Sequence, residues 1–161
     1  MENNMHSFVH TNLHVFYRIA YESHMAMNEY LNLGMKPKPD NTHGHIVTYD
    51  PEQKSFKNAL VTIVFCGVFL ESLLHLLIVE RKDFETAKKY DRKSYECKLQ
   101  LLGCNDQPIL DECKHYREAR REIVHEKAYI DNRRIRIAQQ EAASAMELIQ
   151  KIVTYFGLKM D

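Results

Sequence analysis

Apolar residues recur at helical spacing near the start of the sequence and again near its end. Between residues 7 and 33 they stand mostly three or four positions apart, at Val9, Leu13, Phe16, Ala20, Met27 and Tyr30. Over residues 136–156 the same spacing runs through Ala138, Ala142, Ala145, Ile149, Ile152, Val153 and Phe156. Steps of three and four place side chains on one face of an α-helix. Both segments are therefore predicted to be helices that bury one face.

A loop and a helix start are predicted after the first helix. Residues 35–49 contain Pro, Asp, Asn, Gly and two His without any period, which predicts a connecting loop with a mobile tip. Beyond it, Asp50 suits a helix N-cap, Pro51 suits the first helical position, and Gln53 can complete a capping box. We therefore expect a second helix that starts at Pro51 and extends to about Glu80.

This second helix contains a long apolar run. Residues 59–79 are almost all apolar and match the roughly 20 residues that a membrane span needs. Glu71 and His75 interrupt the run, and an acid near the middle of a span costs about 2.5–3.5 kcal/mol. A buried central helix therefore explains the run better than a span, and we expect no membrane association. Within such a helix, Glu71 and His75 stand one turn apart and can form an internal hydrogen-bonded pair.

Three shorter stretches between these long helices also carry helical signals. Residues 81–93 are highly charged and predict a helix followed by a turn. Residues 94–102 predict a short helix that ends at Gly103. Asp106 and Pro108 then open a further helix whose apolar positions again keep helical spacing, with Arg120 occupying an intervening slot on the same apolar face.

Composition favours a single all-α domain. The chain has 161 residues, of which 45% are hydrophobic, and only 5 Gly and 4 Pro can interrupt its helices. Four long helices and a shorter one, joined by short connections, pack most economically as an antiparallel four- to five-helix bundle with the apolar helix at its centre. We therefore expect residues 1–161 to form one helical domain.

The cysteines and the N-terminal residues indicate a cytoplasmic protein. No C-x-x-C pair is formed by the four cysteines, Cys66, Cys97, Cys104 and Cys113. The N-terminal residues do not follow the basic, apolar, then small-residue order of a secretory signal. Reduced thiols in the cytoplasm are the simplest interpretation.

The sequence offers little support for a metal or a cofactor. His6, His10 and His14 stand at steps of four and could present imidazoles on one helix face, but no Cys or acid at matching spacing completes a four-ligand set nearby. No Gly-rich phosphate loop, G-x-S-x-G elbow or H-E-x-x-H run is present. We therefore expect no metal and no cofactor. P-loop nucleotide hydrolysis, serine hydrolysis and zinc proteolysis lack support.

One segment combines basic residues with histidines. The whole chain balances 22 Lys and Arg against 22 Asp and Glu, but residues 114–136 hold eight Lys or Arg and four Asp or Glu, a local balance of +4. His115 and His125 lie in the same stretch. A surface that attracts phosphate would therefore carry groups able to move protons near neutral pH, which suits RNA cleavage better than the reading of DNA sequence.

The segment Arg120-Arg121-Glu122-Ile123-Val124-His125 resembles the HEPN ribonuclease signature, an arginine followed after a spacer of four to six residues by a histidine. Two further stretches are similar to that family: Cys66-Gly-Val-Phe-Leu-Glu71-Ser-Leu-Leu-His75, an apolar helix that contains an acid, and Lys98-Leu-Gln-Leu-Leu102, which precedes the motif helix. The likeness covers roughly residues 55–156. It implies a helical bundle that forms a homodimer and cleaves RNA without a metal, often as a toxin or an anti-phage effector with an antitoxin or defence partner.

The resemblance also implies roles for individual residues. Arg120 would stabilise the phosphate, His125 would act as general acid and base, and Glu71 would orient one of them from the neighbouring helix. Arg121 is a second candidate for the cation, because positions five apart lie about 140° apart on a helix and only Arg121 would share a face with His125. RNA contacts are expected from Arg117, Lys127 and Arg133. Some relatives are silenced at a tyrosine two residues after the histidine, a position that Lys127 occupies here.

Three other interpretations remain open. One is a membrane-inserted bundle that uses residues 59–79 as its span. The charged residues around Arg120 can simply solvate a surface helix and pair locally. Alternatively, the chain is a non-catalytic HEPN-like helical module that binds RNA or a protein partner through the same face.

Overall fold

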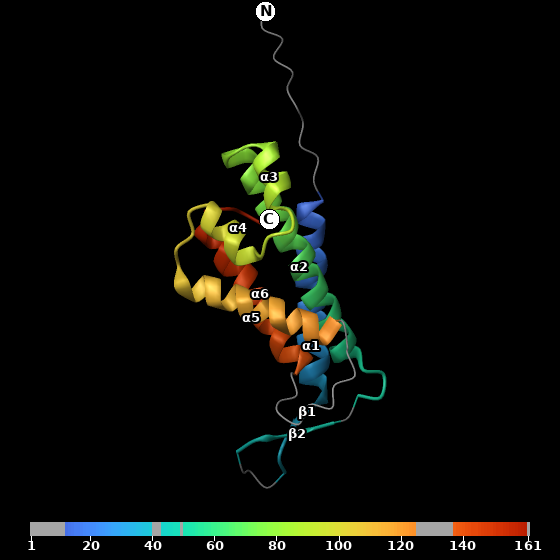
Figure 1. The fold of residues 1–161 in the computed structure, drawn as a ribbon. Coiled ribbons are helices and arrows are strands. Elements are labelled where there is room, and N and C mark those ends of the chain that lie inside the picture. Colours follow the sequence, from blue (N-terminus) through green and yellow to red (C-terminus); the bar gives the residue numbers. More distant parts are fainter. Residues whose placement is uncertain (1–11, 40–42, 49, 125–136, 161) are drawn as a thin grey trace, which may run out of the picture.

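The computed structural model describes residues 12–39, 43–48, 50–124 and 137–160 (Figure 1). The described helices are α1 (Leu13–Gly34), α2 (Lys54–Arg81), α3 (Phe84–Tyr90), α4 (Tyr95–Leu101), α5 (Gln107–Val124) and α6 (Ala138–Tyr155). Two short strands, β1 (Met35–Pro37) and β2 (His45–Val47), form an antiparallel pair. The predicted all-α bundle is confirmed, with four long helices and two short ones. The bundle is not uniformly aligned, because α5 runs across α2 in Figure 1 while α1 and α2 run side by side.

Helix α2 is the centre of the bundle and contacts each of the other five described helices. Its side chains Cys66, Phe69, Leu70 and Leu74 are fully buried within one continuous hydrophobic core. By length and composition α2 is also the one helix among the described residues that could cross a membrane. Its burial on several sides fits the predicted core helix of a soluble protein, because a packed core and a lipid bilayer both select apolar residues.

The prediction of an unstructured loop over residues 35–49 is wrong in part. Helix α1 ends at Gly34, the backbone becomes extended at Met35, and β1 then pairs with β2 in the register Lys36 to Ile46. The amide of Thr48 closes the base of the hairpin on the Gly34 carbonyl at 2.7 Å. Strands of only three residues are too short to show an alternating pattern, so the sequence did not reveal them.

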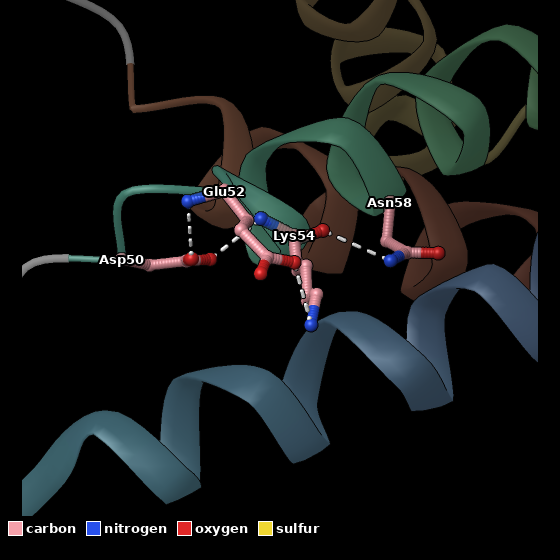
Figure 2. A network of polar contacts seen from close by, with 4 residues as sticks. All are labelled: Asp50, Glu52, Lys54 and Asn58. Carbon is pink, nitrogen blue, oxygen red and sulfur yellow. Dashed lines mark hydrogen bonds and ion pairs between the residues drawn. The ribbon is translucent and has the colours of Figure 1, made fainter.

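The predicted start of α2 is also wrong by three residues. Helix α2 begins at Lys54, because Gln53 has a left-handed backbone conformation with φ of 53° and separates Pro51 from the helix. Asp50 still acts near the helix start: its carboxylate accepts from the amides of Glu52 at 3.0 Å and Lys54 at 2.5 Å, as Figure 2 shows. No side-chain capping hydrogen bond comes from Gln53. The turn therefore replaces the capping box.

The later helix starts follow the local signals in the sequence. The Asp83 carboxylate accepts from the amide of Thr86 at 2.6 Å and caps α3. Ser94 caps α4, and Asp106 accepts from the amide of Ile109 at 3.2 Å at the start of α5. These polar side chains satisfy amides that have no partner inside the helix. All four cysteines are free thiols.

Candidate functional site

Arg120 lies against the middle of α2, at a position that has no side chain. The face of α5 that packs into the core contains the buried residues Cys113 and Tyr116, and Arg120 continues this face one turn after Tyr116. A Cβ atom added to Gly67 would lie 2.8 Å from Nε of Arg120 and 3.0 Å from its Cζ. The arginine thus fits into an apolar face because α2 has a glycine at the point of contact.

Glu71 follows Gly67 by one turn of α2 and lies beside the same guanidinium. Its Oε1 atom is 3.8 Å from Nη1 of Arg120. That distance is an ion pair but too long for a hydrogen bond. The same oxygen accepts a hydrogen bond from the hydroxyl of Tyr95 in α4 at 3.1 Å. Glu71 is therefore hydrogen-bonded to a tyrosine, and the expected internal pair with His75 is not formed among the described contacts.

The donors of Arg120 are incompletely used. Its Nε atom is buried and has no hydrogen-bond partner within the described part of the chain. Its side chain is 32% exposed, and that of Glu71 is 55% exposed. A buried donor without a partner costs free energy, of the order of 1–3 kcal/mol. The side chain therefore lies half inside the bundle, with one edge enclosed and the rest open to solvent.

Two buried tyrosines support this arrangement from α4 and α5. The Tyr116 hydroxyl donates to the carbonyl of Ile63 in α2 at 2.6 Å, and its ring stacks on that of Tyr95 with centroids 6.2 Å apart. Burial raises the pKa of Tyr95, the Glu71 carboxylate raises it further, and Arg120 acts in the opposite direction. Burial also raises the pKa of Tyr116 well above its usual value. Both hydroxyls therefore stay protonated near neutral pH and act as hydrogen-bond donors.

The neighbouring arginines of α5 have different surroundings. Arg121 is exposed. Arg117 donates from Nη2 to Oε1 of Glu96 in α4 at 3.2 Å and keeps 44% of its side chain exposed. Burial acts to raise the pKa of Glu96, but a backbone hydrogen bond, the Ser94 hydroxyl and Arg117 lower it below its usual value. Of Arg117, Arg120 and Arg121, the predicted cations that the structure describes, Arg120 is therefore the one enclosed by the bundle.

His115 lies on the opposite side of α5 from Arg120, toward α6. Its Nε2 atom is 2.8 Å from Oε2 of Glu141, and both line a hollow of about 200 Å³ between the two helices. Nearby, Lys151 pairs with Glu112 at 2.6 Å. His115 and Arg120 belong to the same basic segment of the sequence, but the fold places them on different sides of α5.

Several predicted site residues lie outside the described part of the chain: His125, Lys127 and Arg133. The spacing of Arg120 and His125 around the helix accordingly stays a prediction. Within the described ranges, no group of three or more His, Cys, Asp or Glu side chains comes together as a metal site, and His6 and His10 lie beyond those ranges.

Sequence reasoning did not identify Gly67 or Tyr95 as part of the site. A signal for Gly67 was present, because a single glycine inside a long apolar helix often marks a close approach of another segment. Tyr95 offered no such signal, since Tyr95 and Glu71 belong to different helices and are 24 positions apart in the sequence.

Comparisons of the chain with models of protein families, with curated proteins and with solved structures give no match. Function is therefore inferred from the residues themselves.

Proposed function

We propose that this protein is a metal-independent endoribonuclease of the HEPN type, in which Arg120 stabilises the phosphate and His125 transfers protons. The observation that carries the proposal is the incompletely paired guanidinium of Arg120, held on α2 beside Glu71 and followed five residues later by a histidine. An arginine whose donors are all used cannot bind a phosphate. The Nε edge of Arg120 is enclosed, but its Nη groups make no hydrogen bond among the described residues, and 32% of the side chain is exposed.

The proposed chemistry needs only groups that the motif contains. The 2′-hydroxyl of the RNA loses a proton to a base, its oxygen attacks the adjacent phosphorus, and the bond to the 5′ oxygen of the next nucleotide breaks as that oxygen takes up a proton. The products are a 2′,3′-cyclic phosphate and a 5′-hydroxyl. His125 is assigned the proton transfers, and Arg120 is assigned the negative charge that develops on the phosphate oxygens.

Residues around the motif are assigned to RNA binding and to regulation. Arg117 is exposed on the same helix, and it joins Lys127 and Arg133 as proposed phosphate contacts. From the family resemblance we further propose a homodimer in the cytoplasm, acting as a toxin or defence effector with an antitoxin or other partner protein. Lys127 in place of a tyrosine argues against silencing by modification at that position.

The test is cleavage of total cellular RNA by the purified protein in excess EDTA. We expect the wild type to cut and His125→Ala to be inactive while keeping the far-ultraviolet circular dichroism of the wild type. Arg120→Ala and Arg121→Ala are a matched pair, because both remove one arginine from adjacent positions of α5. Loss of cleavage in Arg120→Ala alone supports the assignment, and loss in Arg121→Ala alone would transfer the role to Arg121.

Two results would contradict the proposal. Equal cutting by the wild type and His125→Ala would mean that the site is elsewhere or that a contaminant cuts the RNA. If no variant cuts but the wild type binds RNA, the non-catalytic binding module becomes the better description.

A further inference from the structure

We propose that Gly67 and Tyr95 are positioning residues for Arg120. The missing side chain of Gly67 lets the Nε edge of the guanidinium pack against α2. Tyr95 donates a hydrogen bond to the Glu71 oxygen that would otherwise bond to Nη1 of Arg120. Together they keep the arginine fixed but only partly neutralised. The functional consequence rests on the proposed RNA cleavage, whereas the geometric part can be tested without it.

The glycine has a structural cost that its contacts explain. Glycine is the least favourable residue inside a helix apart from proline, and Gly67 is buried in the middle of α2, the longest of the described helices. Two side chains of α5 reach the space left by its missing Cβ, namely Nε of Arg120 and the hydroxyl of Tyr116, each 2.8 Å from the position of that atom. Any other residue would force one or both of them to move.

The tyrosine controls how strongly Glu71 and Arg120 pair. Oε1 of Glu71 lies at hydrogen-bond distance from the Tyr95 hydroxyl, 3.1 Å, but 3.8 Å from Nη1 of Arg120. Stacking on Tyr116 holds the Tyr95 ring in place. Without the hydroxyl, the carboxylate would be left to bond the guanidinium directly. An arginine in a two-fold hydrogen-bonded pair with a carboxylate has fewer donors for a phosphate.

The first experiment follows the Nε–H proton of Arg120 by NMR and needs no RNA. In the wild type this proton is enclosed, so it should exchange with water more slowly than that of exposed Arg121. Gly67→Ala should accelerate the exchange by about tenfold or more. The comparison is repeated in a Tyr116→Phe background, where the added methyl group no longer meets the Tyr116 hydroxyl but still meets Arg120. Arg120→Lys and Arg121→Lys assign the two signals.

An unchanged exchange rate in Gly67→Ala, in both backgrounds, would overturn the role of Gly67 whatever the RNA experiments show. Conversely, a protected proton that Gly67→Ala releases supports the positioning role even if the wild type proves inactive on RNA. The two proposals can therefore fail separately.

The second experiment measures KM and kcat for RNA cleavage by Tyr95→Phe. We expect KM to rise by about tenfold, with a smaller effect on kcat, because Glu71 then competes with the phosphate for Arg120. Adding Glu71→Gln should lower KM again, since the competing charge is gone. Tyr155→Phe is the control: it also removes one tyrosine hydroxyl, which donates to the backbone carbonyl of Gly103 instead of to a carboxylate. An unchanged KM in Tyr95→Phe, or no recovery in the double variant, would overturn the role of Tyr95.

Discussion

The two sides of helix α5 hold their charged residues in opposite ways. Toward α6, His115 lies 2.8 Å from Glu141 and Glu112 lies 2.6 Å from Lys151 across the helix interface. The side chains of His115, Glu112 and Lys151 are about half exposed. Toward α2, the guanidinium of Arg120 is 3.8 Å from the Glu71 carboxylate, and its buried Nε atom has no hydrogen bond within the described part of the chain. Close pairing at the surface satisfies the charges locally. Incomplete pairing leaves the Nη groups of Arg120 without a hydrogen bond among the described residues, and a phosphate site requires such donors.

The largest expected effect is a difference in RNA cleavage between a variant on the α2 side of α5 and a variant on its α6 side. Arg120→Lys keeps the positive charge but loses the planar fork, so RNA cleavage should fall by about 100-fold or more. His115→Gln removes an imidazole from the α6 side and should leave cleavage within about twofold of the wild type. The measurement is kcat/KM on one RNA substrate for both variants. A strong loss in His115→Gln would place proton transfer on the α6 side and break the comparison.

A smaller effect is expected in the stability at alkaline pH. The pKa values of Tyr95 and Tyr116 are raised in the folded protein, mainly by burial. Their contribution to stability is thus fully present below the unfolded pKa of about 10 and is lost as pH rises above it. Urea unfolding should show a loss of about 1.4 kcal/mol in total between about pH 9 and 11 for each such tyrosine, with most of the loss above pH 10.

Tyr95→Phe and Tyr116→Phe each remove one of these contributions and should flatten the decline. A residual slope is expected in the double variant, because burial also raises the pKa of the Cys66 and Cys113 thiols to about 12 and raises that of Tyr17. A slope that neither substitution changes would mean that the two hydroxyls titrate alike in the folded and unfolded chain, and that the α2 side is as open to water as the α6 side.

The smallest expected effect concerns the exposed pair on the α6 side. Glu112→Gln removes the charge that Lys151 contacts, but surface ion pairs contribute little because water and salt screen them. The urea midpoint at neutral pH should stay within experimental error of the wild type, at both low and high salt. A clear destabilisation would show that this interface depends on its charges more than the exposure of the two side chains suggests.

Local sequence signals were sufficient for most of the helices but not for the approach of distant side chains. Asp83, Ser94 and Asp106 cap the helices that follow them, because a cap needs only a polar side chain two or three residues from the amide it binds. The sequence predicted the start of α2 at the wrong residue, since a glutamine does not indicate the left-handed backbone conformation that Gln53 adopts. The periodicity of α5 also placed Arg120 on the apolar face, without explaining it.

What the sequence by itself determined is the helical class, the burial of the apolar helix and the position of an arginine within an apolar stripe. These follow from periodicity, which acts over a few residues. Only the tertiary structure decided that Arg120 meets Gly67 and Glu71, that Tyr95 holds Glu71, and that His115 faces α6. Such contacts join residues tens of positions apart, and they depend on which helix faces pack together and at what crossing, which no local pattern specifies.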